Sequence, residues 1–174
     1  ADVLAGKAEV GRRVLLVDLP GHGRSSEPPA FDVTALGVSL REALDAVLEP
    51  GERAVVLGNS LGGAAAIRYA LSSPDRVGAL VLTSPAGAPL NDEEQAEIRA
   101  VFALRSREDA RRFLARLVHA PPWYFRAIEA SLVDQLGRPF IQSFLHAVRP
   151  EDFFSPEELA TLKPPVTLHV GMQR

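Results

Sequence analysis

The chain of 174 residues contains no cysteine, so it cannot form disulfide bonds, use a thiolate as nucleophile or bind zinc through cysteine. It also lacks any apolar run of the roughly 18–20 residues that a membrane-spanning helix needs, so no membrane span is expected. Its 19 basic and 22 acidic residues are interspersed, and no one-sided basic patch for nucleic acid is expected. The hydrophobic content of 47% is ordinary for a globular domain with one core.

Short apolar runs alternate with helical patterns in the first half of the chain. Residues 13–18, 54–57 and 77–83 are apolar runs typical of strands that are buried on both faces of a sheet. Residues 34–48 carry leucines at helical spacing, and residues 61–72 are small and rich in alanine. The order strand, helix, strand, helix, strand predicts the α/β class, with a parallel sheet and helices on both of its faces.

Only helical patterns follow between about residue 89 and a fourth predicted strand at 166–170. Asn91 precedes Glu94 by three positions, and Ser155 precedes Glu158 by the same spacing, which is the arrangement of a helix capping box. The aromatic residues concentrate in this stretch, where they are expected to form its core and in part to line an apolar pocket. The predicted segments are a core at 1–88, a helical insertion at 89–162 and a return to the core at 163–174.

A serine lies at the junction of the second predicted strand and the helix after it. The five residues Gly58-Asn59-Ser60-Leu61-Gly62 fit the pattern G-x-S-x-G, which forms a sharp strand-to-helix turn called the nucleophile elbow. Such a turn places Ser60 at positive φ and lifts its hydroxyl clear of the sheet, and glycines at Gly58 and Gly62 relieve the crowding. The helix N-terminus directs the backbone N–H of Leu61 towards an oxyanion beside the serine. The alternative interpretation of the same five residues is an ordinary turn of small residues.

A second motif lies upstream and reads Asp18-Leu-Pro-Gly21-His-Gly23-Arg-Ser25. It resembles the D-x-P-G-x-G-x-S segment that follows a central strand in the α/β-hydrolases, ahead of their nucleophile elbow. The wording Gly-Asn-Ser-Leu-Gly-Gly at 58–63 is similar to the elbows of the esterase and carbon–carbon bond hydrolase branches. The helical insertion resembles the lid of this family, and residues 164–171 resemble the strand that precedes its catalytic acid. The resemblance implies an α/β-hydrolase with Ser60 as nucleophile.

The resemblance also implies parts that this sequence does not contain. In the family the catalytic acid follows the strand matched by 166–170, about three residues after a glycine like Gly171, where this sequence has Arg174. The family's histidine comes one strand later, and an oxyanion loop precedes the strand matched by 13–17. We therefore expect both ends to be cuts in a longer protein, and little catalytic turnover by these 174 residues alone.

Four histidines are available within the sequence, and none follows an acid at the required place. His22 is interpreted as a surface loop residue, and Asp18 as the residue that shapes the same turn. His119 is expected to place a charge near the C-terminus of a helix, which is favourable. His146 is expected to pack or to be solvated, and His169 to be a core histidine within a buried strand. None is predicted to be the catalytic base.

These residues favour a serine hydrolase that acts by acyl transfer, with a carboxylic ester of small apolar character as the leading substrate class. Carbon–carbon bond cleavage of a dienone-like ring-opening product is the first alternative, because of Asn59 and the Gly62-Gly63 pair. A non-catalytic binding module is the second alternative, because the acid and the histidine are missing. No cofactor, metal, nucleic acid or membrane partner is implied, and the cytoplasm is the default expectation for the location.

Overall fold

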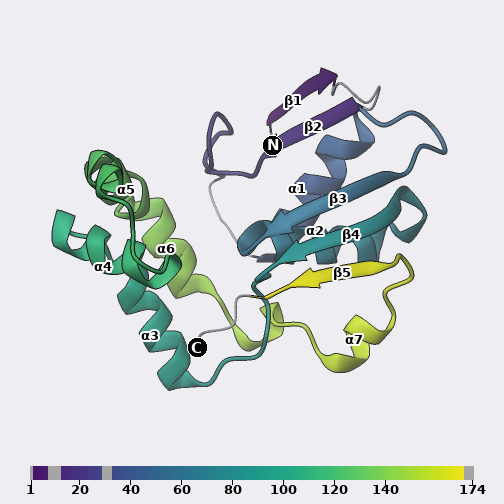
Figure 1. Cartoon of the computed structure of the whole chain (residues 1–174). Coiled ribbons are helices and arrows are strands. Elements are labelled where there is room, and N and C mark those ends of the chain that lie inside the picture. The colour runs from purple at the N-terminus through teal and green to yellow at the C-terminus, as the bar shows by residue number, and fades with distance from the viewer. Residues whose placement is uncertain (1, 8–12, 29–32, 171–174) are drawn as a thin grey trace. The chain divides into compact units, whose positions relative to one another are not determined.

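The structure is a computed structural model that describes residues 2–7, 13–28 and 33–170 (Figure 1). The chain divides into two compact units. The core unit comprises residues 1–89 and 149–174, and the helical unit comprises Leu90–Val148. The elements of the core unit are β1 (Asp2–Lys7), β2 (Arg13–Asp18), α1 (Val33–Asp45), β3 (Ala54–Asn59), α2 (Leu61–Ser72), η1 (Pro74–Arg76), β4 (Val77–Thr83), η3 (Pro150–Asp152), α7 (Pro156–Ala160) and β5 (Val166–His169).

Three parallel strands form the main sheet of the core unit, in the order β3-β4-β5. The predicted parallel sheet is confirmed, and the predicted spans of β2, α2 and β4 agree with the structure. An antiparallel pair of β1 and β2 was not predicted. The carboxyl ends of the three parallel strands share one edge, because Asn59 pairs with Thr83 and Thr83 pairs with His169. Residues at this edge are therefore brought together from distant parts of the sequence.

Helices α1 and α2 pack together, and α2 covers one face of β3 and β4 (Figure 1). Leu36 of α1 and Tyr69 of α2 are fully buried there, and alanines 64–66 allow a close approach of α2 to the sheet. Burial of a side chain such as Leu36 contributes about 1.5–3 kcal/mol. Val55 and Leu57 on the opposite face of β3 are 53% and 73% exposed. Within the described residues, this face of β3 is thus only partly covered.

A groove separates β2 from β3, which belong to different sheets. Its volume is about 800 Å³. The edges of both strands line it, and Leu40, Leu44 and Leu48 of the α1 region form an apolar wall. Figure 1 shows β2 and β3 running in the same direction.

The helical unit is built from short helices, of which the first two have side-chain caps at their N-termini. Its elements are α3 (Asp92–Phe102), α4 (Arg107–Leu117), η2 (Trp123–Ile128), α5 (Glu129–Leu136) and α6 (Pro139–Ala147). The predicted capping box is present at α3, where the Asn91 side chain accepts from the Glu94 N–H and the Glu94 carboxylate accepts from the Asn91 N–H. Leu104, Ala110 and Phe113 form the buried cluster of this unit.

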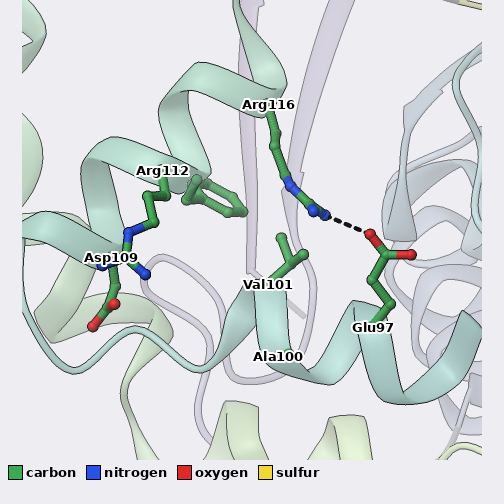
Figure 2. Close-up of a pocket in the computed structure, with 7 residues that line it drawn as sticks. Glu97, Ala100, Val101, Asp109, Arg112 and Arg116 are labelled. Atoms are coloured by element: carbon green, nitrogen blue, oxygen red, sulfur yellow. Dashed lines mark hydrogen bonds and ion pairs between the residues drawn. The ribbon is translucent and has the colours of Figure 1, made fainter. Parts of the chain in front are cut away.

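A small pocket of about 200 Å³ lies between α3 and α4 (Figure 2). Glu97 and Arg116 form an ion pair at its rim, with 3.0 Å between Oε1 and Nη1. Its remaining wall combines Ala100, Val101 and Phe113 with the charged Asp109 and Arg112. The Asp109 carboxylate is already engaged, since it accepts from the Ser106 hydroxyl at 2.8 Å. The charged groups of this pocket thus already have partners, inside the pocket or beside it, and the chemistry predicted for the chain lies elsewhere.

Candidate active site

Ser60 stands alone between the last residue of β3 and the first residue of α2. Its backbone has φ 49° and ψ −118°, so the positive φ predicted for this position is observed. Non-glycine residues rarely adopt positive φ, and such strain persists only where the surrounding structure enforces it. The side chain of Ser60 is exposed and makes no hydrogen bond within the described residues. The hydroxyl is therefore free to meet a molecule from solvent.

Of the two glycines predicted to relieve crowding at the elbow, Gly58 is required and Gly62 is not. A Cβ atom at Gly58 would lie 2.5 Å from the carbonyl oxygen of Gly62, and a Cβ atom at Gly63 would lie 2.7 Å from the Cβ of Pro85. A Cβ atom at Gly62 would meet nothing within 4 Å, so the predicted crowding at Gly62 is wrong. The close approach involves the backbone of Gly62 and not its missing side chain. The sequence pattern predicts close packing at Gly63, but not that its neighbour is Pro85 of the loop after β4.

Backbone hydrogen bonds fix the elbow to the end of β4. The Ser60 N–H donates to the Thr83 carbonyl at 3.1 Å, and the Ser60 carbonyl accepts from the Ala86 N–H at 2.9 Å. The same carbonyl accepts from the Gly63 N–H at 2.9 Å, which begins the helical pattern of α2. Leu61 is the first residue of α2, and the first N–H groups of a helix have no acceptor within the helix. The Leu61 N–H therefore has no acceptor within α2, and its role as an oxyanion donor stays a prediction.

The second motif forms a tight turn after β2, shaped by Asp18. The Asp18 carboxylate accepts from the Arg24 N–H at 3.0 Å, and the Asp18 carbonyl accepts from the Ser25 hydroxyl at 2.7 Å. Gly23 has φ 51°, and a Cβ atom there would collide with the Asp18 carboxylate. His22 Nδ1 lies 3.0 Å from the Pro20 carbonyl oxygen, a contact within the same turn. Asp18 is accordingly occupied by the turn, and His22 is a loop residue.

The other histidines lie away from Ser60 or in the other unit. His169 ends β5, and two strand spacings, about 10 Å, separate its backbone from Asn59. His169 is exposed, so its prediction as a buried core residue is wrong; β5 is paired on one edge only, with β4, among the described strands. His119 and His146 are exposed residues of the helical unit. The described residues thus place no histidine in hydrogen-bond contact with Ser60.

The described part of the chain offers neither a cluster of metal ligands nor a membrane-spanning helix. Among residues 2–7, 13–28 and 33–170, no group of three or more Asp, Glu or His side chains could hold a metal ion. No helix in the described ranges combines the length and apolar character needed to cross a bilayer. The site itself presents an exposed hydroxyl beside the N-terminus of α2.

Comparison with known proteins identifies the family of this chain. Residues 2–173 match the model of the alpha/beta hydrolase family, and the chain belongs to that family. The fold class predicted from the sequence is thereby confirmed. The structure is similar to the 2-hydroxy-6-oxo-6-phenylhexa-2,4-dienoate hydrolase of a Rhodococcus strain, with a TM-score of 0.76 and 22% identity over 94% of this chain and 64% of that chain. At this identity the likeness concerns the fold alone.

Relatives with curated functions are esterases and carbon–carbon bond hydrolases. An esterase of Mycobacterium tuberculosis is 42% identical over 55% of this chain and 33% of its own length. A 2-hydroxy-6-oxononadienedioate/2-hydroxy-6-oxononatrienedioate hydrolase of Cupriavidus pinatubonensis is 45% identical over 41% of this chain and 25% of its own length. A pimeloyl-[acyl-carrier protein] methyl ester esterase of Yersinia enterocolitica is 36% identical over 61% of this chain and 40% of its own length. The chain spans less than half the length of these relatives, and all of them are hydrolases.

Proposed function

We propose that this protein is a serine hydrolase that acts by acyl transfer on a carboxylic ester, with Ser60 as the nucleophile. The Ser60 oxygen attacks the ester carbonyl, and the Leu61 N–H donates to the oxyanion that develops. The alcohol then leaves, and water releases the acid from the acyl-enzyme. The observation that carries this proposal is the exposed hydroxyl of Ser60 at φ 49° between β3 and α2. Esterases among the relatives support the ester as substrate class.

The helical unit is proposed to act as the lid of the site, as the resemblance implies, and to supply apolar side chains for the substrate. Lid residues of this kind would select for a small apolar ester. Within the described residues no histidine contacts Ser60 to activate it, and the chain spans less than half the length of its curated relatives. The 174 residues by themselves are expected to turn over little or no ester.

Replacement of Ser60 tests the proposal in the full-length protein. Ser60→Ala should lower kcat for a p-nitrophenyl ester by several orders of magnitude, because it removes the atom that forms the acyl-enzyme. Ser143→Ala is the matched control, since Ser143 is an exposed serine of α6 in the helical unit. Ester hydrolysis that is unchanged by Ser60→Ala would refute the role of this serine.

Carbon–carbon bond hydrolysis is the second candidate for the same serine. The Cupriavidus pinatubonensis relative supports it, as does Asn59 within the elbow. Purified full-length protein should be offered both short-chain esters and a dienone of the ring-opening type. Turnover of the dienone with little ester hydrolysis would favour this candidate, and the reverse would favour the esterase. Turnover of neither substrate class would favour the non-catalytic binding module.

A further inference from the structure

The loop after β4 contacts the segment in which the chain returns from the helical unit. The chain leaves the core unit at Pro89 and re-enters it at Arg149. Just inside these points the Phe154 N–H donates to the Gly87 carbonyl at 2.8 Å. Gly87 has φ 115°, and a Cβ atom there would collide with the ring of Phe154. The ring therefore lies flush against the backbone of Gly87, and Phe154 itself is only 3% exposed.

The guanidinium of Arg68 also contacts Phe154. The guanidinium carbon of Arg68 lies 4.5 Å from the centroid of the Phe154 ring, within the range of a cation–π contact. Arg68 Nη2 donates to the Asp152 carbonyl at 3.1 Å, and Nη1 lies 3.6 Å from a Glu158 carboxylate oxygen. The Arg68 side chain is only 18% exposed, and its contacts with the buried Phe154 and Asp152 are better shielded from solvent than the one with Glu158, which is 46% exposed. Arg68 belongs to α2, the helix that begins directly after Ser60.

The loop at 84–87 lies between this contact and the nucleophile elbow. On one side Gly87 meets Phe154, as described. On the other side the Ala86 N–H donates to the Ser60 carbonyl at 2.9 Å, and Pro85 limits the space at Gly63. The left-handed φ of 39° at Ser84 is a further sign that its surroundings determine the path of this loop. Phe154 thus contacts the loop that holds the backbone of Ser60.

We propose that Phe154, held by Arg68, is a positioning residue that presses the loop 84–87 onto the elbow and so fixes Ser60 for attack. Phe154 contacts Gly87, and Gly87 follows the residue whose N–H binds the Ser60 carbonyl. Loss of the ring frees the loop, and Ser60 samples orientations that do not reach the ester carbonyl. Misplacement of a reacting group by about 1 Å can cost roughly a hundredfold in rate. This inference rests on the proposed function of Ser60. The contacts of Phe154 with Gly87 and Arg68, called the clamp below, can be measured without activity.

The test compares Phe154→Leu with Phe153→Leu in the full-length protein. Phe153 is the adjacent, half-buried phenylalanine and serves as the matched control. Phe154→Leu is expected to lower kcat for the ester by about 10- to 100-fold, with KM within about twofold. The amide of Ala86 is expected to exchange its hydrogen at least about tenfold faster in this variant, because its bond to Ser60 opens more often. Phe153→Leu is expected to change neither quantity.

Each outcome decides a separate part of the inference. Unchanged exchange at Ala86 in Phe154→Leu would overturn the clamp, and faster exchange with unchanged kcat would overturn its role in positioning Ser60. If the protein shows no hydrolysis that depends on Ser60, the proposed function fails and the Ala86 exchange alone decides the clamp. If Phe154→Leu does not fold, Arg68→Met replaces it in the same two measurements, because it keeps the stem and removes the guanidinium. The same faster exchange and lower kcat are expected for Arg68→Met.

Discussion

At the scale of single residues, the elbow shows that a missing side chain can matter as much as a reactive one. Gly58 faces the backbone of Gly62, and a Cβ atom at Gly58 would lie 2.5 Å from the Gly62 carbonyl oxygen. Backbone atoms cannot move aside as the end of a long side chain can, so the strand or the helix would have to shift. The position of Ser60 depends on both elements, since it is the only residue between β3 and α2.

Gly58→Ala is therefore expected to destabilise the protein by about 1–3 kcal/mol, the usual range for overpacking of a tight site. Chemical denaturation followed by circular dichroism measures the free energy of unfolding. Gly62→Ala is the matched control, because its Cβ atom would meet nothing within 4 Å and alanine favours the helix. Equal destabilisation by both substitutions would contradict the assignment of crowding to Gly58.

The sequence predicted what depends on local pattern and missed what depends on neighbours in space. The span 61–72 of α2 was predictable from its composition, and the turn at Ser60 from the G-x-S-x-G pattern. The contact of Gly63 with Pro85 was not predictable, because the two residues meet only when β3 and β4 pair. The exposure of His169 depends in the same way on which strands flank β5. Part of the candidate site thus follows from pairing in the sheet, which the sequence pattern does not specify.

At the scale of elements, one buried carboxylate joins two helices of the helical unit. Glu129 at the start of α5 is 2% exposed, and its carboxylate accepts from Arg111 Nε of α4 at 2.8 Å. The hydrogen bond and charge of Arg111 lower the pKa of Glu129 below its ordinary value of 4.5, although burial opposes this shift. Sequence patterns could predict caps within one helix, such as Asn91 with Glu94, but not this pair between helices.

The lowered pKa of Glu129 predicts the direction of a pH effect on stability. A carboxylate with a lower pKa in the folded state stabilises that state above its unfolded pKa, and this contribution is lost as the pH falls through the folded pKa. Glu129→Gln should therefore lower the free energy of unfolding at pH 7 and have a progressively smaller effect below about pH 4.5. Denaturation of the full-length protein in both forms between pH 3 and 7 measures the difference.

Glu108→Gln provides the control for this pH series. Glu108 pairs with the same Arg111 at 3.5 Å, but its side chain is 56% exposed, and exposed ion pairs contribute little. The Glu108 substitution should thus leave the stability nearly unchanged across the same range. A difference between wild type and Glu129→Gln that does not shrink towards acid would show that the titration of Glu129 is not its source.

At the scale of the whole molecule, the core unit exposes apolar side chains on the strands of its sheets. β2 and β3 border a groove of about 800 Å³, and they do not pair with each other. Val55, Leu57 and Leu168 are 53%, 73% and 55% exposed on the strands of the main sheet. Unpaired strand edges and exposed apolar faces are sites where a second chain adds by pairing or stacking. The 174 residues alone are therefore expected to self-associate and to lack a sharp thermal transition.

A charge on the exposed face should reduce this association if the sheet is its source. Leu57→Lys places an ammonium group at the most exposed of these apolar positions, and stacking would have to desolvate it. Sedimentation velocity over a range of concentrations should then show a larger monomer fraction for Leu57→Lys than for the unchanged chain. Leu117→Lys is the control, since Leu117 is 64% exposed in the helical unit and gains the same charge. An equal gain for both substitutions would show that net charge opposes association, and that the uncovered face of β3 is not the contact surface.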